Sequence, residues 1–131
     1  MRLKTISAFS PDGESLKTGA GPNLPPEYNA AIDGSLIGPA AGSCGTAVYR
    51  KALVVVEDIA TDPLWAGYAD LALRHGLRAC WSTPLIAKNG RVLGAFATYS
   101  RKVNRPTPYD LGVIDRLAAS AARCSSLSSW A

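Results

Sequence analysis

The sequence has few of the residues that mark several common classes of protein. It contains three cysteines and one histidine in 131 residues. Three widely spaced cysteines argue against the disulfide framework of a small secreted domain and favour a reducing compartment. A zinc site is not expected either, because no Cys-x-x-Cys pair occurs and His75 stands alone. We therefore expect a cytoplasmic protein without a metal site.

Long apolar runs and dense charge runs are also missing. The longest aliphatic run, 52–56, is far too short to cross a bilayer, and no signal peptide follows Met1. The net charge is +4, but the cations are scattered, and only Arg101, Lys102 and Arg105 lie close together. A phosphate-binding patch needs clustered cations. We therefore expect neither a nucleic acid nor a membrane as a partner.

The remaining composition is that of one globular domain over residues 1–131, with 47% hydrophobic and 18% charged residues. Residue patterns predict strands at 3–9, 15–20, 53–59, 77–87 and 91–100, and helices at 26–32, 43–50, 64–76 and 108–123. Hairpins near both ends favour an α/β (α+β) fold with a mostly antiparallel sheet. The connecting helices should cover one face and the terminal helix the other. The serine-rich tail 125–131 is expected to fray.

Local signals refine these elements. The Ser43 side chain is expected to cap the N–H groups of Gly45 or Thr46. The apolar run 53–59 is typical of a central strand. A helix should begin at Thr61-Asp62-Pro63 and end at Gly76. Asn89-Gly90 predicts a type I′ turn between two hairpin strands.

Four blocks of the sequence occur in the order and spacing of a known family. They are Gly42–Ala47, Val55–Ile59 with Asp62–Trp65, Gly76–Pro84, and Gly90–Ala97. Together they resemble the GAF domain family, in the form found in bacterial sensor histidine kinases and diguanylate cyclases, over about 3–122. The resemblance implies a six-stranded antiparallel sheet with helices on both faces and a ligand pocket under the cross-over segments. The family's long N-terminal helix, which often pairs with the C-terminal helix in a dimer, is not expected, because the first strand begins almost at Met1.

The resemblance also places a ligand site beside the strand that contains Cys80 and Trp81. Neighbours in a strand point to opposite faces, so one of the two should face the pocket and the other the far side. Trp65 and Tyr68 would form an aromatic lid, and N–H groups at the two helix starts could bind a small anion. The candidate ligand-binding residues are Ser43, Cys44, Thr46, Leu64, Trp65, Tyr68, Cys80, Trp81 and Thr83.

The function that the resemblance implies is non-catalytic sensing of an unidentified small molecule or small anion in a bacterial signalling protein. The terminal helix would relay binding to a histidine kinase or diguanylate cyclase output module, as in two-component systems, and a homodimer is a further expectation. No cofactor follows from the motifs. A covalently attached bilin is not expected, because Trp81 follows the cysteine where bilin-binding relatives have histidine.

Two alternatives stay open. One is a thiol-dependent enzyme similar to free methionine sulfoxide reductases, acting through Cys44 or Cys80. Such chemistry needs a second thiol to resolve the oxidised one. No cysteine precedes Cys44, and Cys80 lies on the strand, whereas the reductases carry theirs in the preceding loop. The other alternative is a scaffold that dimerises without a ligand.

Overall fold

A single antiparallel sheet organises the chain in the computed structural model, which describes residues 2–9, 15–20, 25–32 and 35–122. Its six strands follow the order β3-β2-β1-β6-β5-β4. The strands are β1 Arg2–Phe9, β2 Ser15–Ala20, β3 Ser35–Leu36, β4 Val54–Val56, β5 Ala79–Ile86 and β6 Val92–Ser100. The helices are α1 Pro26–Ile32, α2 Cys44–Arg50, the 3₁₀ helix η1 Pro63–Trp65, α3 Ala69–Arg74 and α4 Pro108–Ala122. The predicted fold class is confirmed, whereas the tail 125–131 lies outside the described residues.

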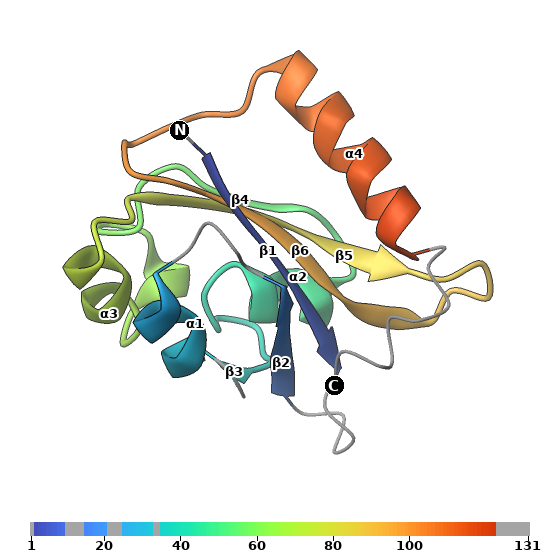
Figure 1. Ribbon diagram of the computed structural model, residues 1–131, viewed down its shortest axis with the longest axis horizontal. Coiled ribbons are helices and arrows are strands. Elements are labelled where there is room, and N and C mark those ends of the chain that lie inside the picture. Colours follow the sequence, from blue (N-terminus) through green and yellow to red (C-terminus); the bar gives the residue numbers. More distant parts are fainter. Residues whose placement is uncertain (1, 10–14, 21–24, 33–34, 123–131) are drawn as a thin grey trace.

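The helices cover the two faces of the sheet unequally. Helices α1, α2 and α3 lie on one face, and α4 lies alone across the other (Figure 1). We call these the helix face and the α4 face. This arrangement is the one that the order of elements predicted. Among the helices of the described residues, none is both long enough and apolar enough to cross a bilayer.

Strands β5 and β6 form the centre of both cores. Cys80 pairs with Tyr99 and Trp81 with Thr98 across the two strands. Because side chains alternate along a strand, Cys80 and Tyr99 belong to the cluster on the helix face. Trp81 packs on the α4 face instead, in a cluster that includes Ile114 of α4. Both strands are therefore buried on both sides.

Strand β4 corrects the expectation of a central strand at 53–59. It is only three residues long, and it forms the edge of the sheet beside β5. Val54 and Val56 pack into the helix-face cluster, and Val55 packs against the cluster around Trp81. An apolar run therefore indicates that both faces of a strand are buried. An edge strand is also buried on both faces when helices cover both sides of the sheet.

The hairpin between β5 and β6 occurs where it was predicted, but its turn is different. A type I′ turn needs a positive φ at two residues, and here Gly90 has φ +84° while Asn89 does not share this conformation. The Gly90 N–H donates to the Ala87 carbonyl, and the Asn89 side chain accepts from the Arg91 N–H. The loop is therefore a three-residue turn that ends in a left-handed glycine.

The segment predicted as one helix over 64–76 is divided in two. Its start is confirmed, since the Asp62 carboxylate accepts from the Leu64 N–H at 2.9 Å and Pro63 follows. Gly67, with φ +87°, then separates η1 from α3. Gly76, with φ +77°, ends the helix as expected.

Helix α4 begins with a pair of reciprocal hydrogen bonds. The Asp110 N–H donates to the Thr107 hydroxyl at 3.1 Å, and the Thr107 N–H donates to the Asp110 carboxylate at 2.8 Å. This arrangement is a capping box, with Pro108 at the first helical position. Of the apolar side chains of α4, Ile114 and Ala118 are buried, whereas Leu111 and Leu117 are more than one-third exposed. The helix therefore contacts the sheet along a narrow line.

Replacing Thr107 with alanine should destabilise the domain by about 1 kcal/mol, because the first turn of α4 loses its side-chain cap. Urea denaturation followed by circular dichroism measures this change. Thr107→Ser keeps the hydroxyl and should stay close to the wild type. Equal stability of the alanine variant and the wild type would show that the cap does not hold α4.

Candidate functional site

A buried serine hydroxyl joins three elements at the start of α2. The Ser43 Oγ donates to the Cys80 carbonyl of β5 and accepts from the Trp65 Nε1–H of η1, both at 3.0 Å. The Gly42 N–H donates to the Leu64 carbonyl at 2.8 Å, which ties the same turn to η1 a second time. The predicted capping role of Ser43 is therefore wrong: its hydroxyl bonds to the sheet and to η1, and no side-chain cap is formed.

Two thiols lie beside this serine and share one neighbouring hydroxyl. The Cys44 Sγ lies 3.0 Å from the Ser82 Oγ, and the Cys80 Sγ lies 3.7 Å from the same atom. A hydrogen bond with Cys80, helped by one with Ser82, lowers the pKa of Cys44 against the opposing effect of burial. Burial raises the pKa of Cys80 well above its ordinary value. No cysteine precedes Cys44 in the chain, but the fold brings Cys80 beside it.

An aromatic cluster on the same face was not predicted. The Tyr28 hydroxyl donates to the Tyr99 hydroxyl at 3.0 Å, and the two rings meet edge to face with centroids 5.5 Å apart. The centroid of the Trp65 ring lies 6.5 Å from that of Tyr99, and the centroid of the His75 ring lies 5.5 Å from that of Tyr28. Burial raises the pKa of both tyrosines, so the pair stays protonated and neutral. Only the tertiary fold brings α1, α3 and β6 together here, so no local signal pointed to it.

The other helix-face candidates have ordinary packing roles. Thr46 is buried, and its hydroxyl donates to the Gly42 carbonyl and accepts from the Ala41 N–H. Leu64 packs against the apolar cluster. Trp65 is buried as a lid residue should be, but Tyr68 is 39% exposed and does not close over it.

The start of η1 does not offer free N–H groups to an anion. The Leu64 N–H donates to the Asp62 carboxylate, and the Trp65 N–H donates to the Asp62 carbonyl. An anion would have to displace the negatively charged side chain of Asp62. The expectation that this helix start could bind an anion is therefore not supported by its geometry.

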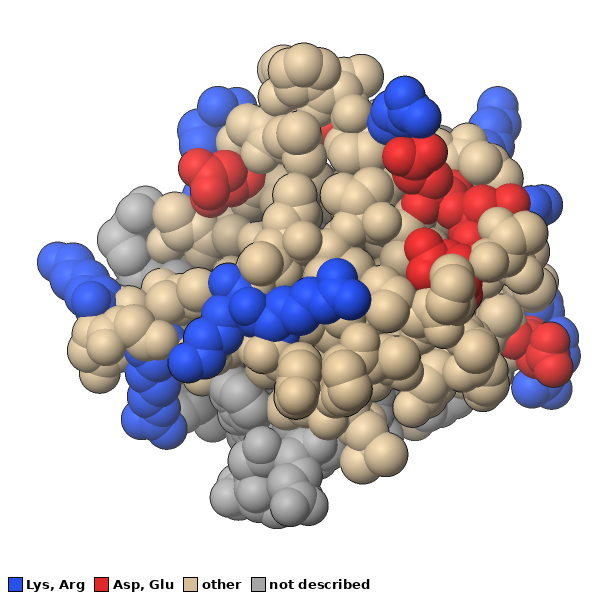
Figure 2. Space-filling view, turned by 180° about the vertical axis from the view of Figure 1, so that it is seen from behind, with Lys and Arg blue, Asp and Glu red and all other residues tan. Residues whose placement is uncertain are grey.

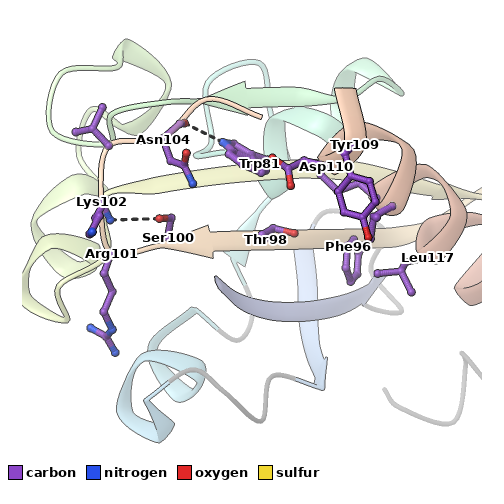
Figure 3. Close-up of a pocket in the computed structure, with 13 residues that line it drawn as sticks. Trp81, Phe96, Thr98, Ser100, Arg101, Lys102, Asn104, Tyr109, Asp110 and Leu117 are labelled. Carbon is purple, nitrogen blue, oxygen red and sulfur yellow. Dashed lines mark hydrogen bonds between the residues drawn. The ribbon is translucent and has the colours of Figure 1, made fainter. Parts of the chain in front are cut away.

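The remaining two candidates lie on the opposite side of the sheet. Trp81 lines a cavity of about 720 Å³ between the sheet and α4, which we call the α4 groove (Figure 3). Its floor includes Phe96 and Thr98 of β6, and its helix wall includes Tyr109 and Leu117. Thr83 lines a separate cavity of about 420 Å³. The nine candidates therefore do not form one site.

The connector between β6 and α4 closes one end of the α4 groove. The Trp81 Nε1–H donates to the Asn104 carbonyl at 3.2 Å, which fixes the indole against the connector. Asn104 is held in turn by a bond from its N–H to the Glu57 carbonyl. Arg101 lies at the rim of the groove, but its guanidinium points away and donates to the His75 carbonyl (Figure 3). Polar groups therefore gather at this end, where they meet the buried indole of Trp81.

The described lysine and arginine side chains do not form a single basic patch on the face seen in Figure 2. On the face seen in Figure 2, the lysine and arginine side chains are spread out, and acidic side chains gather mainly toward one side. Two ion pairs, Arg78–Asp58 and Arg105–Glu57, both have N–O distances of 3.2 Å. Within the described residues, no three histidine, cysteine or acidic side chains are grouped closely enough to hold a metal ion.

Comparisons with known proteins agree on one family. A sequence profile of the GAF domain matches residues 5–124. The methyl sulfide methyltransferase-associated sensor of Methanosarcina acetivorans is 33% identical over 112 residues, which are 86% of this chain and 11% of that protein. The chain therefore spans about a tenth of the length of this relative.

Solved structures show the same fold at low sequence identity. A domain described as part of a two-component sensor histidine kinase from Sinorhizobium meliloti is 21% identical, with a TM-score of 0.74 over 93% of this chain and 76% of the other. A type II free methionine-R-sulfoxide reductase from Thermoplasma acidophilum is 18% identical, with a TM-score of 0.71 over 92% and 75% of the two chains. The fold is thus similar to that of both a signalling domain and an enzyme.

Replacing Ser43 with alanine should destabilise the domain by about 1–3 kcal/mol, because the buried Trp65 Nε1–H loses its acceptor. Trp65→Phe removes the donor as well, so the double variant should cost less than the sum of the two single variants. Urea denaturation of all four proteins measures this coupling. Additive changes would show that the bond between Ser43 and Trp65 does not contribute to stability.

Proposed function

The chain belongs to the GAF domain family, and we propose that it is a non-catalytic sensory domain in which a bound small molecule repositions α4. The relative from M. acetivorans is itself named a sensor. That protein is far longer than this chain, which leaves room for an output domain in a protein of that kind. A histidine kinase or diguanylate cyclase module is the output that we propose, with a homodimer as the signalling assembly.

The main observation behind this proposal is the α4 groove. A volume of about 720 Å³ lies in the range of small-molecule sites. A molecule in the groove would touch the sheet through Trp81 and Phe96, and α4 through Val113 and Leu117. Its binding free energy would therefore depend on the distance between α4 and the sheet. A ligand that prefers one distance shifts the population of helix positions toward it.

The helix-face residues are a weaker place for the ligand. Ser43, Cys44 and Cys80 are engaged with Trp65 and Ser82 in direct contacts. The cavities of 720, 420 and 260 Å³ lined by described residues do not reach Ser43 or Cys80. A ligand at this place would have to displace the Trp65 indole. We therefore keep these residues only as a second candidate binding site.

The lining of the α4 groove suggests the chemistry of the ligand. Trp81 and Phe96 form a buried aromatic floor, and Ser100, Asn104 and Lys102 lie toward the connector. A flat or apolar body with a polar group at one end would satisfy both parts. The narrow contact between α4 and the sheet lets the helix move at a modest cost in buried area.

Filling the α4 groove should abolish ligand binding. Val113→Trp places an indole in the groove, whereas Arg116→Trp adds the same side chain at an exposed position of α4. The amphiphilic dye 1-anilinonaphthalene-8-sulfonate, an aromatic body with one sulfonate, should fluoresce with the wild type and the Arg116 variant and lose its signal with the Val113 variant. A metabolite panel in thermal shift then identifies natural ligands, since a ligand at one hundred times its dissociation constant stabilises by about 2.7 kcal/mol.

The two variants also separate the sensor from a dimerisation scaffold. A scaffold without a ligand would show no metabolite-dependent shift in any of the three proteins. Equal dye binding by the wild type and the Val113 variant would place the ligand elsewhere and would contradict the role of the α4 groove.

A thiol-dependent reductase is the second candidate, because Cys44 and Cys80 lie side by side and the fold is similar to that of a free methionine-R-sulfoxide reductase. We expect no turnover of free methionine sulfoxide with dithiothreitol, measured as methionine formed. Turnover that disappears in Cys44→Ser would overturn the non-catalytic proposal.

A further inference from the structure

Two thiols lie close together on the helix face, and the proposed sensory function does not use them. Cys44 begins α2, Cys80 is the second residue of β5, and the Ser82 hydroxyl contacts both sulfurs. No segment has to unfold to bring the two thiols together. The sequence separates them widely, so their proximity is a property of the fold alone.

The two thiols are not equivalent. Cys44 is partly exposed, whereas Cys80 is fully buried. Hydrogen bonds with Cys80 and Ser82 lower the pKa of Cys44, and burial raises the pKa of Cys80. A partly exposed cysteine with a lowered thiol pKa beside a buried second thiol is the arrangement found in redox-sensing cysteines, where one sulfur is oxidised and the other resolves it.

We propose that Cys44 and Cys80 are a reversible oxidation site, at which a hydroperoxide converts the two thiols into a disulfide between α2 and β5. Cys44 is the sulfur that the peroxide attacks, and Cys80 is the resolving thiol. The substrate class is a small hydroperoxide, because Cys44 is only partly exposed. This inference is independent of any ligand in the α4 groove.

The reaction balances in two steps. In the first, the Cys44 thiolate attacks the peroxide, an S–O bond forms, the O–O bond breaks, and the leaving oxygen takes a proton to become water or an alcohol. In the second, the Cys80 sulfur attacks the Cys44 sulfur, the S–S bond forms, and the S–O bond breaks. The departing hydroxide and the Cys80 proton leave as water. The peroxide is reduced by two electrons, and two thiols are oxidised to one disulfide.

The disulfide would link elements that the Ser43 hydroxyl already joins, namely α2 and β5. Ser43 precedes Cys44 and binds both the Cys80 carbonyl and the Trp65 indole. A covalent link from the next residue to the same β5 position would fix α2, η1 and β5 more tightly. Oxidation would thus restrict the helix face without entering the α4 groove.

The test uses the full chain with Cys124→Ser, so that only Cys44 and Cys80 remain. Hydrogen peroxide should lower the intact mass by two hydrogens, dithiothreitol should restore it, and peptide mapping should join Cys44 to Cys80. With Cys80→Ser added, Cys44 should instead form a sulfenic acid that dimedone traps. With Cys44→Ser added, Cys80 should stay reduced. Circular dichroism checks folding, and Cys44→Ala or Cys80→Ala replaces the serine variant at the same position if that variant does not fold.

Three outcomes would overturn the proposal: an unchanged mass in peroxide, a gain of oxygen in place of the loss of hydrogen, or equal oxidation of the two single-thiol variants. Free methionine sulfoxide in place of peroxide separates this site from the reductase. A disulfide formed with the sulfoxide and not with peroxide would contradict the proposal. Failure of dye binding in the α4 groove would leave these results unaffected.

A second measurement tests the part played by Ser82. Ser82→Ala should slow the alkylation of Cys44 by iodoacetamide several-fold, because the thiolate loses a hydrogen bond. Ser100→Ala removes a buried hydroxyl on the α4 face and should leave the rate unchanged. An equal rate for Ser82→Ala and the wild type would contradict the activation of Cys44 by this serine.

Discussion

The burial of β5 on both faces is the constraint on which the rest of this structure depends. Side chains alternate along the strand, so each residue is committed to one of two cores. Cys80 belongs to the helix face and Trp81 to the α4 face. A shift of the register by one residue would exchange these cores, placing an indole among the thiols and a thiol under α4. The pairing with β6 and the edge strand β4 holds this register.

The two faces created by this alternation differ in how firmly they are closed. On the helix face, Ser43 joins α2, η1 and β5 through two buried hydrogen bonds, and the tyrosine pair fills the space beside it. On the α4 face, one helix lies over the sheet and leaves the α4 groove open. A closed face suits residues that must keep a fixed geometry, such as two thiols. An open face suits a ligand and a helix that moves.

Under the two proposals, the domain would respond to its surroundings at two separate sites, one on each face of the sheet. A molecule in the α4 groove would act directly on α4, the helix that we propose relays binding to an output domain. Oxidation of the thiols would act on the opposite side of the same two strands, where a disulfide would hold α2 against β5. Strands β5 and β6 contact both regions, so they are the physical connection between them. Coupling between the two would appear as a change in groove affinity after oxidation.

Much of the fold follows from the sequence, because short-range patterns encode it. Helix 26–32, the hairpin around Asn89-Gly90 and the end of α3 at Gly76 occur where the patterns predicted them. The family motifs also predicted the six-stranded antiparallel sheet with helices on both faces. The type of the hairpin turn and the break at Gly67 were missed, since several backbone conformations suit the same residues.

The candidate site was less accessible to prediction, because it depends on contacts between distant segments. Strand alternation required Cys80 and Trp81 to face opposite sides, but it could not say which of them faced α4. The partner of the Ser43 hydroxyl, the Tyr28–Tyr99 pair and the proximity of Cys44 to Cys80 each join elements far apart in the chain. The sequence by itself determined most of the elements, their order and the family. The tertiary structure alone decided which thiols, hydroxyls and rings meet, because those contacts arise only when the helices pack onto the finished sheet.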